Sequence, residues 1–159
     1  MSKIVTSAGD AAAYMELVDR SNECTKLIKV GKLKEAEKLL RNVLARKPAA
    51  GFDEVSVALT QNELGGVLRQ LGEMDEALEL LTKALEVRDR ADEEADIITA
   101  LRDGNITRDE IGKVYEAKGD CANALGVRQL GKRICGNEAC EALDYEEAPG
   151  LEEPPQAAV

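Results

Sequence analysis

The chain has 159 residues, enough for one domain with a buried core but too few for a second large one. Aromatic residues make up only 3% of the sequence and there is no tryptophan, so we expect an all-α fold with a core of small and aliphatic side chains. The formal net charge of -10, without a basic stripe interleaved with aromatic residues, argues against binding to nucleic acid.

Amphipathic stretches follow one another along the chain, with apolar residues three and four apart. A flexible leader is expected at residues 1–9. Helices are then expected from residue 10 or 11 to 30, from 33 until Pro48 and Gly51 close the helix, and at 52–71, 74–90, 93–101, 107–118 and 121–134.

Local signals define several helix ends. Asp53 is expected to cap or open the third helix. Asp103-Gly104-Asn105 is a strong breaker, and Thr107 with Glu110 forms a capping box that predicts a new helix there. Asn137 is expected to cap a short turn through residue 143. This gives a helical domain at 10–143 and a disordered acidic tail at 144–159, which contains five acids, no base and three of the four prolines.

The chain aligns with itself when three inter-helix glycines are superposed, at spacings of 41 and 47 residues. These glycines are Gly31, Gly72 and Gly119. An alanine follows each of them five residues later, which lets the second helix of a hairpin approach its neighbour closely. The alanines are Ala36, Ala77 and Ala124.

The repeated residues resemble the tetratricopeptide repeat (TPR). The copy at 58–91 matches the pattern through Leu64-Gly65, Leu68, Gly72, Ala77, Leu81 and Ala84. The copies at about 17–50 and 105–136 match through Leu27, Gly31, Ala36, Leu40 and Pro48, and through Ile111-Gly112, Tyr115, Gly119 and Ala124. The resemblance implies a right-handed α-α solenoid of three helical hairpins plus a C-terminal capping turn.

Two finer likenesses accompany this resemblance. The repeat spacings exceed the usual ~34 residues and look like the longer repeats of kinesin light chains. The stretch from Thr107 to Cys140 is more faintly similar to the end of the repeat region in fungal proteins that continue into a MYND-type zinc finger, although the finger itself is absent from this sequence.

No residue pattern indicates catalysis, a cofactor or a metal. The absence of histidine excludes a serine or cysteine nucleophile with a histidine base, and no glycine-rich phosphate loop follows a strand. Cys135 and Cys140 are separated by four residues, but a closed zinc site needs about four nitrogen or sulfur ligands. Cys24 and Cys121 are expected to pack inside the repeats. We therefore expect a non-enzymatic protein with reduced thiols, in the cytoplasm or nucleus.

Solenoids of this kind usually bind an extended peptide or a partner helix in the concave groove lined by their first helices. Asn62 is suited to brace a peptide backbone, and Arg69 and Lys113 to pair a carboxylate; an ordinary solvated groove is the alternative. The repeat register places these polar positions in the groove: Ser21, Thr25, Asn62, Gly66, Arg69, Asp109, Lys113 and Glu116.

The resemblance also excludes one partner class. Chaperone adaptors of this family clamp a C-terminal carboxylate with lysine and asparagine at set positions. In this chain the clamp positions are Ser21, Thr25, Glu63, Ile106 and Glu110. Binding of a chaperone tail is therefore not expected.

The leading hypothesis is a protein interaction module or scaffold, an adaptor that binds a protein or peptide and not nucleic acid. Membrane binding is also not expected, since no apolar run approaches the ~20 residues of a membrane span. A second hypothesis is self-assembly into a homo-oligomer, because residues 1–50 carry 10 basic and 6 acidic residues whereas 51–159 carry 11 and 25. Further alternatives are a regulatory remnant of a MYND-finger protein and an acidic tail that occupies the groove.

Overall fold

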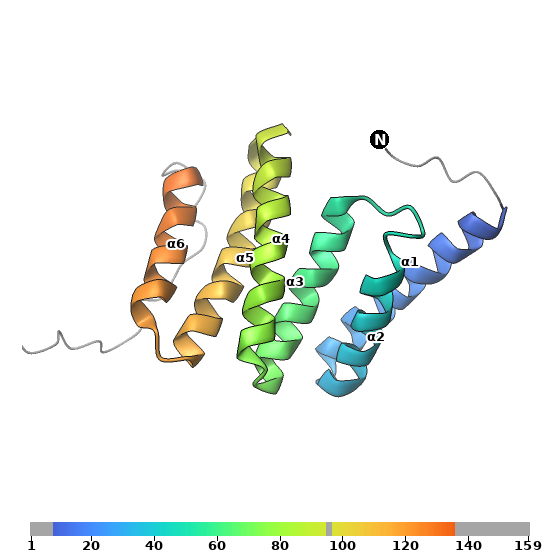
Figure 1. The fold of residues 1–159 in the computed structure, drawn as a ribbon, viewed down its shortest axis with the longest axis horizontal. Helices are drawn as coiled ribbons and strands as arrows, with labels where there is room; N and C mark the ends of the chain where they lie inside the picture. Colours follow the sequence, from blue (N-terminus) through green and yellow to red (C-terminus); the bar gives the residue numbers. More distant parts are fainter. Residues whose placement is uncertain (1–7, 95–96, 136–159) are drawn as a thin grey trace, which may run out of the picture.

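The computed structural model describes residues 8–94 and 97–135, and within them it contains six α-helices and no strand (Figure 1). Each helix packs against its neighbours in the chain, and α3 also contacts α5. The all-α prediction is confirmed for this part of the chain, and none of its helices is both long and apolar enough to cross a membrane. The helices are α1 (Ala8–Lys29), α2 (Leu33–Arg46), α3 (Glu54–Leu71), α4 (Met74–Glu94), α5 (Ile97–Ala117) and α6 (Cys121–Cys135).

Three tight turns close the hairpins α1–α2, α3–α4 and α5–α6. Each turn contains a glycine with positive φ: 75° at Gly31, 89° at Gly72 and 78° at Gly119. The glycine N–H donates to the carbonyl three residues earlier, and the following N–H donates to the carbonyl five residues earlier. This is the Schellman motif, in which glycine avoids the clash that a side chain would cause. The predicted glycine stops are confirmed.

The core runs continuously between the two helices of each hairpin and across successive hairpins. Ala36, Ala77 and Ala124 are at most 2% exposed, as expected for small residues at a close helix contact. The largest fully buried aliphatic side chains are Leu17, Leu40, Val43, Leu64, Val67, Leu68, Leu81 and Val114.

An aromatic contact fixes the corner where α1 meets the loop before α3. The rings of Tyr14 and Phe52 stack with their centroids 4.0 Å apart. The Lys47 ammonium lies 5.0 Å from the Phe52 centroid and donates to the carbonyl and the hydroxyl of Ser56, each at 3.1 Å. Burial lowers the pKa of Lys47.

Asp53 caps α3 as predicted, because its carboxylate accepts the Ser56 N–H at 2.7 Å.

The predicted break at Asp103-Gly104-Asn105 is wrong. Helix α5 runs without interruption from Ile97 to Ala117, and Gly104 is buried within it. The capping box is wrong for the same reason. Thr107 lies in the middle of α5, is fully buried, and its hydroxyl accepts a hydrogen bond from Arg88 at 3.1 Å. Tertiary packing of α5 on α4 therefore overrides the local breaker signal.

Other boundaries differ less. Helix α4 extends to Glu94 rather than ending near residue 90, and residues 8 and 9, expected in the leader, are the first of α1. Cys24 is buried as expected, but Cys121 is exposed because it is the first residue of α6. Leu130 on α6 is 49% exposed. The expected turn after Asn137 and the acidic tail lie outside the described residues.

Candidate functional site

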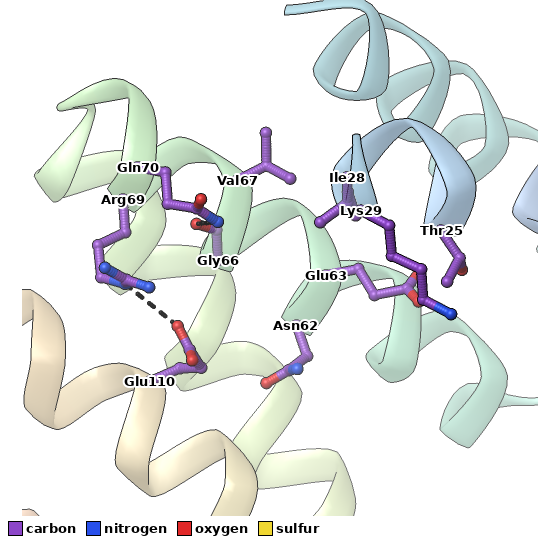
Figure 2. Close-up of a pocket in the computed structure, with 10 residues that line it drawn as sticks. All are labelled: Thr25, Ile28, Lys29, Asn62, Glu63, Gly66, Val67, Arg69, Gln70 and Glu110. Atoms are coloured by element: carbon purple, nitrogen blue, oxygen red, sulfur yellow. Dashed lines mark hydrogen bonds and ion pairs between the residues drawn. The ribbon is translucent and has the colours of Figure 1, made fainter. Parts of the chain in front are cut away.

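A pocket of about 300 Å³ opens between α1, α3 and α5, the first helices of the three hairpins (Figure 2). Its position matches the groove that the repeat register predicts. Helix α3 supplies most of the wall, α1 forms one side, and α5 contributes one carboxylate. The pocket is lined by Thr25, Ile28, Lys29, Asn62, Glu63, Gly66, Val67, Arg69, Gln70 and Glu110.

The pocket contains four of the eight residues predicted for the groove: Thr25, Asn62, Gly66 and Arg69. Ser21 lies one turn before Thr25 on α1 and does not line the pocket; its hydroxyl donates to the Leu17 carbonyl at 2.9 Å. The other three residues, Asp109, Lys113 and Glu116, are on α5 and do not line the pocket. They belong to a network of ion pairs that Glu110 connects to Arg69.

The cations predicted to pair a ligand carboxylate already have acidic partners in this chain. Arg69 Nε lies 3.1 Å from Glu110 Oε2, a bond drawn in Figure 2. Lys113 Nζ lies 2.8 Å from Asp109 and 2.9 Å from Glu110. Burial acts to lower the pKa of Lys113, but the hydrogen bonds to the two carboxylates outweigh it and raise this pKa. A ligand carboxylate would have to compete with these internal partners.

The α5 network continues onto the last described helix. Arg128 on α6 bonds Asp109 at 3.2 Å and forms a two-pronged ion pair with Glu116. The Glu116 hydrogen bonds raise the pKa of Arg128, and Arg128 lowers the pKa of Glu116. Asp109 and Glu116 therefore join the helices of the third hairpin, a role that the sequence register alone did not reveal.

Two adjacent residues on α3 have unsatisfied hydrogen-bonding groups. Asn62 Oδ1 is buried and accepts no hydrogen bond within the described residues. Glu63 is partly buried, and this burial raises the pKa of its carboxyl although Lys47 and Arg88 act to lower it. In Figure 2 Glu63 points toward α1 and Thr25, whereas Asn62 points away from α1. Both groups are hydrogen-bond acceptors at the pocket wall.

Glu63 and Glu110 were not predicted as groove residues. The resemblance places both at clamp positions of the first helices, and these positions face the groove in chaperone adaptors. That correspondence is the signal that would have identified them as groove residues.

Cys24 lies near this wall, and its burial, followed by the charge of Glu63, raises the pKa of its thiol to about 11. Such a thiol stays protonated at neutral pH and does not act as a nucleophile.

Residues 56–127, which cover most of α3, all of α4 and α5 and the first half of α6, match the model of one family, described as tetratricopeptide repeat. Residues 56–127 belong to the tetratricopeptide repeat family. The hairpin α1–α2 lies before the matched segment, and its likeness rests on the Gly31 turn and the buried Ala36. No curated protein and no solved structure matches the chain significantly. The finer likenesses to kinesin light chains and to MYND-finger proteins stay predictions.

Tetratricopeptide repeats mediate contacts between proteins. This supports the coarse prediction that the chain is an interaction protein. In the described part of the chain, no group of three or more histidine, cysteine, aspartate or glutamate residues is arranged to hold a metal ion.

Proposed function

We propose that the chain binds an extended segment of a partner protein in the groove formed by α1, α3 and α5. The observation that carries this proposal is the pocket of about 300 Å³ between these helices. Asn62 lines this pocket, and its buried Oδ1 lacks a donor within the described residues. Rotation of the side chain toward the groove would let a peptide backbone N–H supply one.

Gly66 gives the groove its depth. It lies in the middle of α3, and a Cβ at this position would meet only Glu110 Oε2, at 3.6 Å, which is an ordinary contact. A larger side chain is therefore tolerated by the fold and would project into the pocket. Gly126 on α6 offers a matched control, because it is helical and exposed, with no atom within 4 Å of its Cβ position.

The test is affinity purification from the native cell with wild type, Gly66→Leu and Gly126→Leu. Both substitutions replace a helical glycine by a better helix former, which stabilises a helix by about 0.5–1 kcal/mol. Partners that wild type and Gly126→Leu retain and Gly66→Leu loses bind in the groove. Identical partner lists for all three proteins would overturn the assignment.

We propose self-association as a second candidate, supported by the outer face of α6. Leu125 and Leu130 are 57% and 49% exposed on this helix, where a further hairpin would pack in a longer array. Light scattering at high protein concentration and low salt tests it. A monomer under those conditions would overturn this candidate and leave groove binding unaffected.

A further inference from the structure

Glu63 differs from the other acidic residue of the pocket. Glu110 accepts hydrogen bonds from Arg69 and Lys113. In the described residues nothing donates to the Glu63 carboxyl group, although the residue is partly buried and burial disfavours its charged form. A desolvated carboxylate without donors destabilises the free protein, so a ligand that brings donors gains from pairing with it.

Three cations of the chain lie near Glu63, and none of them forms an ion pair with it within the described residues. The Lys47 ammonium donates to the Ser56 carbonyl and hydroxyl. Arg88 Nη1 donates to the Thr107 hydroxyl. Lys29 lines the pocket, but it is exposed and forms no ion pair within the described residues. These cations leave the Glu63 carboxylate open to a positive group from outside.

A second acceptor faces the same space. The Thr25 hydroxyl donates to the Ser21 carbonyl at 3.3 Å, so its oxygen keeps lone pairs for another donor. Figure 2 shows Glu63 extending from α3 toward Thr25 on α1. Together the hydroxyl and the carboxylate offer three oxygen acceptors, which equals the three N–H donors of an ammonium group.

Two exposed aliphatic side chains lie one helical turn away from the two carboxylates of the pocket. Leu59 precedes Glu63 by one turn on α3, and Ile106 precedes Glu110 by one turn on α5. Residues four apart share a helix face. Both side chains are 46% exposed, so an apolar group of a partner is able to pack against them.

We propose that this pocket takes a lysine side chain of the partner segment, with its ammonium on Glu63 and Thr25 and a neighbouring aliphatic residue against Leu59 and Ile106. This inference rests on the proposed groove-binding function. It adds the chemistry of the partner: a basic residue beside an aliphatic one.

The test passes pools of capped heptapeptides over the immobilised full-length protein. The central residue is lysine, norleucine or glutamate, and the other positions are randomised among uncharged residues. Norleucine has the four-carbon chain of lysine without its ammonium group. Wild type is expected to retain the lysine pool about tenfold better than the norleucine pool, the range of a charged hydrogen bond, and to reject the glutamate pool.

Four variants sharpen the test. Glu63→Gln is expected to abolish the lysine preference, and Thr25→Val to reduce it about threefold. Glu86→Gln removes one charge from an exposed position on α4 and keeps the preference. Lys29→Gln keeps or increases it, because a competing cation is lost. A preference unchanged by Glu63→Gln, or abolished equally by Lys29→Gln, would overturn the inference.

The same experiment separates this inference from groove binding itself. If wild type retains lysine and norleucine pools equally and Gly66→Leu retains neither, the groove binds peptides but lysine recognition is wrong. If Gly66→Leu and wild type retain every pool alike, both proposals fail.

Discussion

Gly65 on α3 lies so close to Leu81 on α4 that a Cβ at position 65 would be 2.6 Å from Leu81 Cγ. The equivalent pair in the third hairpin is Gly112 with Arg128, where the distance to Arg128 Cζ would be 2.9 Å. The first hairpin has Cys24 at the glycine position, fully buried. It therefore accommodates a side chain where the other two hairpins have only a hydrogen.

Gly65→Ala is expected to destabilise the protein by about 1–3 kcal/mol, because Leu81 must leave its packed position. This cost exceeds the ~1 kcal/mol that alanine gains over glycine in a helix. Urea denaturation measures the change. Gly126→Ala, with open space around its Cβ, is the control and is expected to be slightly stabilising. Stabilisation of both variants would mean that the α3–α4 contact relaxes freely.

Gly72→Ala is expected to cost about 1–2 kcal/mol, because φ at this turn is 89° and an L side chain is strained there. The loss arises from the backbone, since no atom lies within 4 Å of the Cβ position. Thermal denaturation of Gly72→Ala beside Glu73→Ala, an exposed neighbour, distinguishes turn strain from a general surface effect. Equal melting temperatures for the two variants would contradict the prediction.

The ion pair between Glu16 and Arg46 predicts a pH-dependent contribution to stability. Arg46 donates two hydrogen bonds to Glu16, at 2.8 and 3.0 Å. These bonds, with one from Arg20, lower the pKa of Glu16 from 4.5 to about 2. A lowered acid pKa stabilises the fold above pH 4.5, and this contribution disappears as the pH falls toward 2.

Glu16→Gln is therefore expected to be less stable than wild type at pH 7 and nearly equal to it at pH 2. Urea midpoints across this range at low salt measure the difference. The pair is exposed, so the difference is small and shrinks further in high salt. A difference that does not change with pH would show that the charge of Glu16 is unimportant.

Glu63→Gln is expected to have the opposite effect on the free protein. Burial raises the pKa of Glu63 above 4.5, so the folded state loses stability as the pH rises through the folded pKa. The variant should be more stable than wild type at pH 7 and no more stable at pH 4. Thermal denaturation at both pH values checks this, with Glu86→Gln as control. Destabilisation at pH 7 would indicate that Glu63 has a stabilising partner.

The repeat pattern in the sequence predicts the turns and the packing contacts well. Gly72 and Ala77 are determined by local backbone geometry and by a helix contact that recurs in each hairpin, so a periodic sequence reveals both. Gly104 shows where this reasoning fails. A glycine between Asp103 and Asn105 favours a turn locally, but burial against neighbouring helices keeps α5 continuous.

The repeat register identifies four of the residues that line the pocket but not the ion pairs that they form. The repeat register placed Asn62 and Gly66 at the pocket because both follow from helical periodicity. It did not show that Arg69 on α3 pairs with Glu110 on α5. That contact depends on how close the side chains of two residues, 41 positions apart in the sequence, come in the folded protein. The choice of ligand chemistry therefore required the structure.

The stack of Tyr14 on Phe52 makes the first hairpin visible to spectroscopy. The chain has no tryptophan and three tyrosines, and Tyr115 lies in the third hairpin. Selective isotope labelling of Tyr14 and Tyr115 would report the two ends of the array separately. Repeat arrays are able to unfold stepwise from their ends. If the Tyr14 and Tyr115 signals change in the same transition, the array melts cooperatively; if the Tyr14 signal changes first, the array frays from its N-terminal hairpin.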